Sequence, residues 1–523
     1  MLCVATLATA CCCAIGPAGA TSPSTAAGDT SSWTVYHGDP AGSGTADGVT
    51  AVDTNAPAWT SSVLDGELYG EPLVSSGHVY VATENDTFYA LSSTNGAVVW
   101  SAHVGTPVPS SALSCGDITP TVGITGTPVI DQARSEIFAV ADELIDGKPA
   151  HMLVGLSTAT GKVELAQDVD PSGSVPADLL QRTGLTLDAG QVVFGMGGND
   201  GDCATYRGRV IAVPEAGGTP TTFTIDDASG ENQGAVWMGG GAPAVDGNGN
   251  IWVSVGNGSV YSASHAYDDS DSVLELSSAL TLVSYFAPTS WPQNNQHDLD
   301  MSTVPALLSD GQVVLAGKSR IVYLLNGSDL GDIGGQEASL GAACSEDIDG
   351  GIADVGTTVY LPCYSGTIAV QVTQSPPALT LLWSAVVGGG PPIVAAGLVW
   401  TIGHNGVLYG LDATTGKVQQ QASIGIPANH FPTPGVGDGL FLTPAADRVV
   451  AFTATSSASS ITSSTTTTAA PAASATTAPA SPSRSSSGGG ITAADVVAIF
   501  AAGLVLLSGA RWLYRRTRTR RTG

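Results

Sequence analysis

Basic residues are scarce in this chain. Its 523 residues include 17 Lys and Arg against 45 Asp and Glu. Seven of the bases and one of the acids lie in residues 484–523, which leaves ten bases against 44 acids in residues 1–483, a net charge of −34. A body this acidic repels phosphate backbones at low salt, and we therefore exclude nucleic acid and anionic lipid as its partners.

Other patterns are missing as well. The body has no long helical pattern, no phosphate-binding loop, no serine nucleophile elbow and no Cys-x-x-Cys pair. These absences count against a helical fold, against nucleotide and serine-hydrolase chemistry, and against a zinc site. The chain is 43% hydrophobic with 66 Gly, which is too apolar for a disordered protein.

The N-terminus is typical of an exported protein. Residues 1–20 are small and apolar and end in Ala18-Gly19-Ala20, a signal-peptidase pattern, so we predict a signal peptide followed by a flexible segment at 21–32. No Lys or Arg precedes Arg134, although signals normally begin with positive charge. Lipidation of Cys11 is the alternative, but Ala8-Thr9-Ala10 is a poor lipobox.

The C-terminus predicts a membrane anchor. Residues 454–490 are almost entirely Ser, Thr, Ala, Pro and Gly, a composition typical of an extended stalk. Residues 491–510 are long enough for one transmembrane helix, and the arginine-rich tail at 511–523 places that end in the cytoplasm. We expect a single-pass protein of the cell membrane with its body outside.

Export also bears on the cysteines. Removal of the signal leaves four, an even number in an oxidising compartment, which predicts two disulfides. Three connectivities are open, and we favour Cys115 with Cys203 and Cys344 with Cys363.

The body is a repeat array. A Gly or turn followed by a β-branched or aromatic strand recurs eight times, about 52 residues apart, and most copies have further short strands on either side. Four strands at this period predict the blades of a β-propeller. The copies are Gly77–Val81, Arg134–Phe138, Gly190–Phe194, Gly249–Val253, Gly311–Leu315, Gly356–Tyr360, Gly397–Thr401 and Gly439–Leu442.

Closure of the ring can be predicted from its ends. The last unit stops at Val449–Phe452 without a fourth strand, while an unpaired strand, Ala58–Thr60, precedes the first unit. We expect the N-terminal strand to complete the last blade and hide both edges. The predicted fold is an all-β eight-bladed propeller over residues 33–453; seven blades is the alternative, because the fifth and sixth units are degenerate.

Two segments carry a family resemblance. Ala90-Leu-Ser-Ser-Thr-Asn-Gly96-Ala-Val-Val-Trp100 and Leu411-Asp-Ala-Thr-Thr-Gly416-Lys417 resemble the repeat of pyrroloquinoline-quinone-type propellers, and the opening Trp33–Asp39 resembles the start of such proteins. The resemblance covers residues 33–453 and implies the propeller fold. It leaves activity open, because the repeat serves both quinone dehydrogenases and a non-catalytic lipoprotein of outer-membrane barrel assembly.

Long loops predict where function lies. In an up-and-down blade, the loop from the second to the third strand lies on the same face as the connection to the next blade. We expect long loops at Asp142–His151, Gly195–Arg209 and Gly256–Ser272 on this long-loop face, together with the four cysteines. The functional surface is predicted over the second to fifth blades.

The resemblance to quinone dehydrogenases implies a set of site residues. Asn257 stands where that family binds calcium and the quinone, Asp300 or Asp298 where it places a general base, and Lys318 near a Lys that contacts the quinone. In such a site a cation polarises the quinone, a carboxylate accepts the alcohol proton and Lys stabilises the reduced oxygen.

The chain also departs from that family. The mature chain has no adjacent Cys-Cys pair and no Cys-x-x-Cys-His, and its Gly239-Gly240-Gly241 lacks the stacking Trp that should follow; only Trp237 could substitute. The expected calcium Glu has no match, so Asn199, Asp200 or Asp202 would have to replace it.

Structural interpretations compete with the functional ones. Asn257-Gly258 is also a common hairpin turn, and the run Asp268–Asp271 is typical of a solvated loop tip, with calcium binding as the alternative. His297, His404 and His430 show no metal-ligand spacing.

The predicted function is therefore binding of a protein, glycan or small ligand on the long-loop face, with no certain cofactor. The alternative is a dehydrogenase of alcohols or sugars that depends on pyrroloquinoline quinone and calcium.

Overall fold

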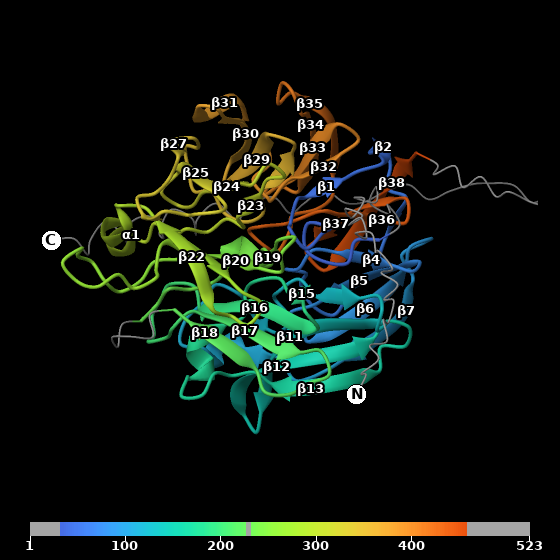
Figure 1. The fold of residues 1–523 in the computed structure, drawn as a ribbon. Helices are drawn as coiled ribbons and strands as arrows, with labels where there is room; N and C mark the ends of the chain where they lie inside the picture. The colour runs from blue at the N-terminus through green and yellow to red at the C-terminus, as the bar shows by residue number, and fades with distance from the viewer. Residues whose placement is uncertain (1–31, 226–231, 458–523) are drawn as a thin grey trace, which may run out of the picture. The chain divides into compact units, whose positions relative to one another are not determined.

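A computed structural model describes residues 32–225 and 232–457. They fold into eight β-sheets that follow one another around a ring, and in Figure 1 the colour runs once around it from blue to red. The predicted eight-bladed propeller is confirmed, and the seven-bladed alternative is wrong.

The strands of blades 1 to 4 are, in chain order, β4 (Leu73–Ser75), β5 (His78–Ala82), β6 (Thr87–Ser92) and β7 (Val98–His103); β10 (Val129–Asp131), β11 (Glu136–Ile145), β12 (Lys148–Ser157) and β13 (Val163–Asp168); β14 (Leu179–Leu180), β15 (Thr186–Asp188), β16 (Gln191–Gly198), β17 (Arg209–Pro214) and β18 (Thr221–Thr224); and β19 (Ala244–Val245), β20 (Ile251–Val255), β21 (Ser272–Leu276) and β22 (Leu282–Ala287), joined by β26 (Asp332–Ile333).

Blades 5 to 8 complete the ring. Their strands are β23 (Ala306–Leu307), β24 (Gln312–Leu315), β25 (Val322–Asn326) and β27 (Ala338–Leu340); β28 (Ala353–Val355), β29 (Thr358–Cys363), β30 (Gly366–Gln374) and β31 (Pro377–Ala385); β32 (Ile393–Ala395), β33 (Leu398–Gly403), β34 (Val407–Asp412) and β35 (Val418–Ser423), joined by β1 (Thr45–Ala46); and β36 (Gly435–Gly437), β37 (Leu440–Ala445) and β38 (Arg448–Ser456), joined by β2 (Val49–Asp53) and β3 (Trp59–Thr60).

The connections hold the remaining elements. These are the strand pair β8 (Val108–Pro109) and β9 (Thr121–Val122), the short 3-10 helices η1 (Ser110–Ala112), η2 (Pro176–Asp178) and η3 (Met238–Gly240), and the helix α1 (Trp291–His297).

Burial explains the order of strands within a blade. The first strands β4 and β32 are buried throughout, because neighbours cover them on every side. The fourth strand alternates between exposed and partly buried residues, as in β7 and β35, because one of its faces meets solvent. The apolar strands of the repeat therefore build the ring's interior, and the outer strands are its rim.

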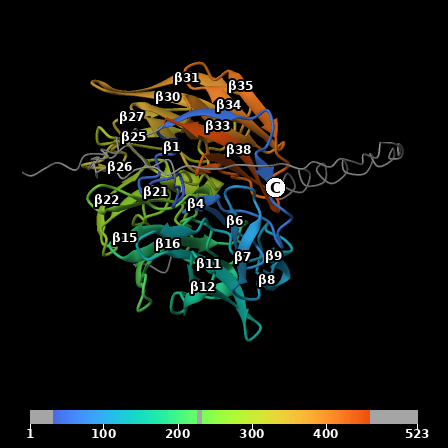
Figure 2. The same cartoon turned by 90° about the vertical axis from the view of Figure 1, so that its right-hand side faces the viewer.

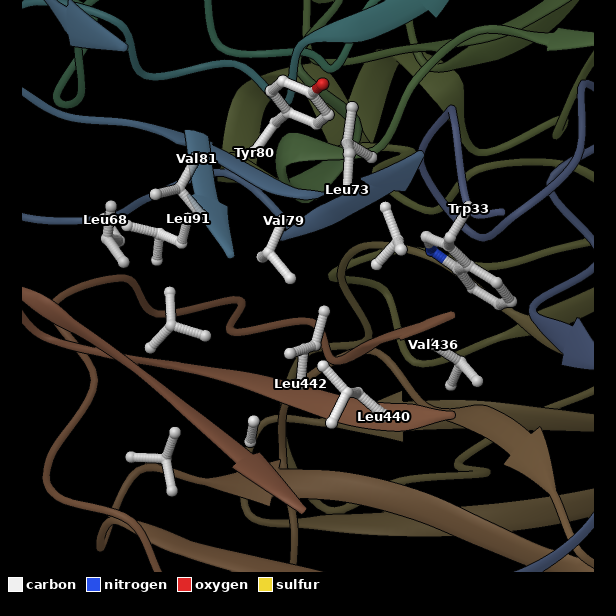
Figure 3. Close-up of a cluster of buried hydrophobic side chains, with 14 of the residues drawn as sticks. Trp33, Leu68, Leu73, Val79, Tyr80, Val81, Leu91, Val436, Leu440 and Leu442 are labelled. Atoms are coloured by element: carbon white, nitrogen blue, oxygen red, sulfur yellow. The ribbon is translucent and has the colours of Figure 1, made fainter. Parts of the chain in front are cut away.

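The ring closes as the sequence predicts. In blade 8, Trp59 and Thr60 of β3 pair with Ala451 and Val450 of β38, and β2 extends the same edge of that strand. Figures 1 and 2 both place blade 8 beside blade 1. The joint between them is apolar: Figure 3 shows Val79 and Leu91 of blade 1 on the side that faces Leu440 and Leu442 of blade 8.

A strap ahead of the first blade crosses the centre of the ring. Residues 33–46 exchange backbone hydrogen bonds with the first strands of blades 1, 2, 4, 6 and 7. The bonded pairs are Trp33 with Val74, Thr34 with Ile130, Pro40 with Val245, Ser43 with Asp354, and Gly44 with Val394. The opening segment therefore binds the inner strands of blades that are far apart in the sequence.

A tryptophan contact links neighbouring blades. Trp100 of β7 donates its indole N–H to the carbonyl of Thr158 in the next blade, at 2.9 Å, and its ring covers Gly161. Trp59 and Trp383 make the same contact with Ser93 and Gly96, and with Ala413 and Gly416. The Gly and the Trp of the repeat thus belong to one contact that successive blades share.

Both favoured disulfides are present. Cys115 in the connection from blade 1 to blade 2 is bonded to Cys203 in the loop of blade 3, and Cys344 is bonded to Cys363 at the end of β29. All four lie at the long-loop face, as predicted.

Several expectations need correction or fall outside the structure. The predicted long loop at Asp142–His151 is wrong: β11 and β12 continue through it, Asp142 pairs with His151, and only Asp146-Gly147 turn. The stalk was predicted from residue 454, yet β38 runs to Ser456. None of the helices in the described ranges is long and apolar enough to cross a membrane. The predicted signal peptide and membrane span at 491–510 lie outside those residues.

The tryptophan contact gives a first prediction. Gly161 (φ +69°) and Gly147 (φ +77°) both occupy turns that favour glycine, but a Cβ at Gly161 would lie 2.5 Å from the Trp100 ring, whereas one at Gly147 meets nothing within 4 Å. We expect Gly161→Ala to lower the free energy of unfolding by about 1–3 kcal/mol more than Gly147→Ala. Chemical denaturation of the two variants measures this; equal losses would contradict a stabilising role for the contact.

Candidate functional site

The predicted site residues meet on the long-loop face at the centre of the ring. Lys318, in the loop between β24 and β25, places its Nζ 2.5 Å from Asp300 Oδ2 and 3.1 Å from Asp298 Oδ1. Asp298 is the left-handed C-cap of α1, with φ 56°, and so ends the helix beside the lysine. One ammonium therefore bridges two carboxylates.

Asn257 completes the same cluster. Its backbone N–H donates to the other oxygen of Asp300 at 2.6 Å, so both carboxylate oxygens of Asp300 are engaged. Gly256 makes this approach possible, because a Cβ there would lie 2.7 Å from Asp300 Oδ1. We call Asn257, Asp298, Asp300, Lys318 and Trp237 the lysine cluster.

Trp237 forms the aromatic side of the lysine cluster. Lys318 Nζ lies 5.3 Å from the centre of the Trp237 ring, within cation–π range. Trp237 is in the connection from blade 3 to blade 4, just before η3, where Gly239 takes φ 55° and a Cβ would strike the Gly350 backbone at 2.5 Å. The glycine-rich turn thus lets this connection pack closely and hold the indole beside the lysine.

A second cation lies close by. Arg182 is buried and donates to Asn429 Oδ1 at 2.7 Å, with its guanidinium 5.5 Å from the Phe431 ring and 5.7 Å from the Tyr69 ring. Phe431 is in turn 5.8 Å from Trp237. A continuous row of three rings and two cations therefore runs from Tyr69 through Arg182, Phe431 and Trp237 to Lys318.

The charges in the lysine cluster stabilise each other. Burial alone would lower the pKa of Lys318, but the carboxylates of Asp300 and Asp298 outweigh it and raise that pKa well above its ordinary value. Burial, followed by repulsion from Asp300, raises the pKa of Asp298 to about 6 despite the lysine. Lys318 therefore remains an ammonium at every physiological pH, with Asp298 as its titratable partner.

The loop of blade 4 is pinned to α1. The predicted solvated tip at Asp268–Asp271 is wrong: Asp268, Ser270 and Asp271 are buried, Asn294 donates to Asp271, and Asn295 Nδ2 donates to Ser270 at 2.8 Å. The side-chain amides of Asn294 and Asn295 thus bond the Asp271 carboxylate and the Ser270 hydroxyl, which the acidic pattern led us to place in water. The hairpin interpretation of Asn257-Gly258 is also wrong, because residues 256–271 form one long loop, as the main prediction had it.

The predicted calcium ligands are paired with other protein groups. Asp202 accepts from the Tyr206 hydroxyl at 2.6 Å and is hydrogen-bonded to the Asn257 side chain. Asp200 lies in the turn that the Asp202 N–H closes on the Asn199 carbonyl. Within residues 32–225 and 232–457, no three His, Cys, Asp or Glu side chains are arranged to hold a metal ion.

Sequence reasoning missed Arg182, Asn429 and Phe431. They come from blade 3 and from the connection between blades 7 and 8, which the family resemblance did not single out. The scarcity of cations was the available signal, because Arg182 is one of only ten bases in residues 1–483.

Comparisons with known proteins agree with this architecture. A family model described as outer membrane protein assembly factor BamB matches residues 24–264. The fold is similar to that of quinohemoprotein alcohol dehydrogenase ADHIIG from Pseudomonas putida HK5, at TM-score 0.60 and 13% identity over 82% of this chain and 81% of that one. The propeller is of the pyrroloquinoline-quinone type.

Two further solved structures have a similar fold. The quinohemoprotein alcohol dehydrogenase of Comamonas testosteroni matches at TM-score 0.57 and 14% identity, with 82% and 81% of the two chains covered. BamB from Moraxella catarrhalis matches at TM-score 0.50 and 12% identity, covering 77% of this chain and all of the other. No curated protein sequence matches the chain. At these identities the likeness to solved structures shows the fold alone.

The lysine cluster gives a second prediction. Lys318→Met keeps the stem but leaves Asp298 and Asp300 without their ammonium. We expect it to cost about 1–3 kcal/mol of unfolding free energy, less than a fully buried pair because half of the Asp298 side chain is exposed. The matched control is Arg320→Met, in the same loop but exposed, with an expected change within about 0.5 kcal/mol. Urea denaturation compares them, and equal effects would contradict the bridging role.

A buried acid beside Arg182 gives a third prediction. Glu84 accepts from the Gly123 N–H at 2.8 Å and the Thr125 hydroxyl at 3.1 Å, yet burial raises its pKa from 4.5 to about 8. The folded state therefore keeps a proton that the unfolded state loses, and stability falls as pH rises through that window. We expect the stability of Glu84→Gln relative to the wild type to rise from about pH 5 to pH 8, by on the order of 1 kcal/mol per pH unit.

Denaturation at several pH values measures the effect. The matched control is the exposed Glu164→Gln, whose difference from the wild type should not grow over this range. A constant difference for Glu84→Gln would contradict the buried titration.

Proposed function

We propose that the protein is a binding module held outside a membrane. Its ligand site is the lysine cluster on the long-loop face of the pyrroloquinoline-quinone-type propeller. The observation that carries this is the pairing of Lys318 with Asp298 and Asp300 against Trp237. The lysine offsets one of the two negative charges and holds the carboxylates in place, so the cluster presents an ordered aromatic and polar surface to a ligand.

The charge of the body limits the ligand. Residues 1–483 carry a net charge of −34, which favours a neutral or cationic ligand over an anionic one. BamB, named as an assembly factor, is a precedent for a binding role of this fold. The protein partner, glycan or small molecule expected from the sequence all remain within this proposal.

The location is part of the proposal. Two disulfides favour an oxidising compartment. Together with the predicted signal at 1–20, stalk at 454–490 and span at 491–510, they support a single-pass protein whose propeller is extracellular.

A quinone-dependent dehydrogenase of alcohols or sugars is the second candidate. The observation in its favour is that Asn257, Asp300 and Lys318 converge beside an indole, which such an enzyme requires. Two observations count against this candidate. The residues expected to bind calcium already make hydrogen bonds to other protein groups. The three carboxylates of pyrroloquinoline quinone would meet Lys318 and Arg182, which are already engaged by Asp298, Asp300 and Asn429.

Titration of the full chain with pyrroloquinoline quinone, with and without calcium, separates the candidates. Tryptophan fluorescence and quinone absorbance report binding. We expect no saturable binding at tens of micromolar; saturable, calcium-dependent binding that is lost in Asn257→Ala and Lys318→Met would overturn the proposal in favour of the enzyme.

A thermal-shift series tests binding itself. Glucose, choline and spermidine sample neutral and cationic ligands, and we expect at least one of them to raise the melting temperature of the wild type and not of Trp237→Ala. A series without any shift, or with the same shift in the variant, would contradict a ligand site at the lysine cluster.

A further inference from the structure

One long stretch of the propeller sequence contains no charged side chain. No Asp, Glu, Lys or Arg occurs between Asp354 and Asp412, a stretch that spans most of blade 6 and the first three strands of blade 7. Lys417 follows in a turn on the opposite face, and no other charged residue comes before Asp438. In a body with a net charge of −34, the loops that blades 6 and 7 and the next connection contribute to the long-loop face are therefore uncharged, and we call them the neutral sector. The exposed acids Glu346 and Asp347 border this sector, because Asp347 is bonded to Tyr364.

Aromatic rings line this neutral sector. Tyr364, in the turn after β29, is 46% exposed and lies 4.7 Å from the ring of His404, in the turn after β33. His430 follows at 6.5 Å, Phe431 at a further 6.3 Å, and Trp237 at 5.8 Å from Phe431. We call these five residues the ring track; it runs from the outer turns of blades 6 and 7 to the lysine cluster.

The rings are fixed by their surroundings. Tyr364 follows the disulfide-bonded Cys363, and its N–H donates to the Asp347 carbonyl at 2.9 Å. The Nε2 of His404 hydrogen-bonds the carbonyl of His430 at 2.7 Å. The Phe431 N–H donates to the Asn429 side chain at 2.9 Å. Because the rings are ordered in advance, a ligand would lose little free energy in ordering them.

The chemistry of the track selects its ligand. Rings with polar edges, such as phenol and imidazole, can stack on the C–H faces of a sugar and also hydrogen-bond its hydroxyls. The loops that carry Tyr364, His404 and His430 have no charged side chain of their own, and the acids beside them and the acidic body repel anions. Successive rings from four segments of the chain suit an elongated ligand better than a single small one.

We infer that the ring track binds a neutral oligosaccharide chain, with one end at the lysine cluster. The inference rests on the proposed binding function and names a ligand class for it. The track also extends the functional surface to blades 6 to 8, beyond the second to fifth blades that the loop lengths predicted.

Calorimetric titration of the full chain with cellohexaose, maltohexaose and N-acetylchitohexaose tests the inference. We expect saturable binding of at least one of them, weakened about tenfold or more by Tyr364→Ala and by His404→Ala. The matched control is Tyr261→Ala, which removes another exposed tyrosine of the long-loop face, 54% exposed over blade 4 and outside the ring track. Its affinity should equal that of the wild type.

Salt provides a second readout, because binding of a neutral chain should not change between about 50 and 500 mM NaCl. The inference is overturned if no hexasaccharide binds, if Tyr261→Ala weakens binding as much as Tyr364→Ala, or if salt abolishes binding. If the thermal-shift series still gives a shift that depends on Trp237, only the oligosaccharide inference fails; if both fail, so does the proposed function.

Discussion

A ring of repeats has two open edges until its first and last blades meet, and here that meeting depends on β38. This strand receives β2 and β3 on one side and β37 on the other, so the last blade contains strands from both ends of the propeller. The apolar joint between blades 1 and 8 follows from the pairing (Figure 3). Without it two apolar edges would be exposed to solvent, which favours aggregation.

The strap at residues 33–46 adds a second constraint. It ties inner strands that are distant in the sequence, so the blades cannot shift independently around the centre. The lysine cluster draws on the loops of blades 4 and 5 and the connections that precede them, and its distances of 2.5 to 3.1 Å require those parts to keep their places. Closure of the ring and geometry of the site are therefore linked.

Charge is distributed in sectors around the long-loop face. Carboxylates surround Lys318 over blades 3 to 5, whereas the loops of blades 6 and 7 on this face carry rings and no charged side chain. A ligand approaching this face meets an acidic sector and a neutral aromatic one that share Trp237. This division makes one face able to hold both the polar end and the uncharged length of a single molecule.

The repeat period made the fold predictable, because Gly, Trp and the β-branched strands report contacts within and between adjacent blades. The Trp59 strand was predicted from the strand missing in the last unit. The disulfides were predicted from export and the even number of cysteines. Asp142–His151 was missed because charged residues in a long hairpin look like a loop. The burial of Ser270 and Asp271 is accompanied by hydrogen bonds from Asn295 and Asn294 of α1, which the local sequence around residue 270 does not show.

The site was predictable only in part. The resemblance brought together Asn257, Asp300 and Lys318 by motif position. It could not show that Lys318 bridges Asp298 and Asp300, nor that Phe431 and Arg182 arrive from other blades. Such contacts depend on how eight similar units are rotated around one axis, which no local pattern encodes.

The position of β38 also has a mechanical consequence. The chain leaves the propeller from this strand, which pairs with β37 over Arg448–Thr453 and, on its other side, with β2 and β3. A pull along the strand from the residues that follow is thus shared by two rows of hydrogen bonds loaded together, rather than opened one at a time. The last strand is a firm point of attachment because the first residues of the propeller hold it.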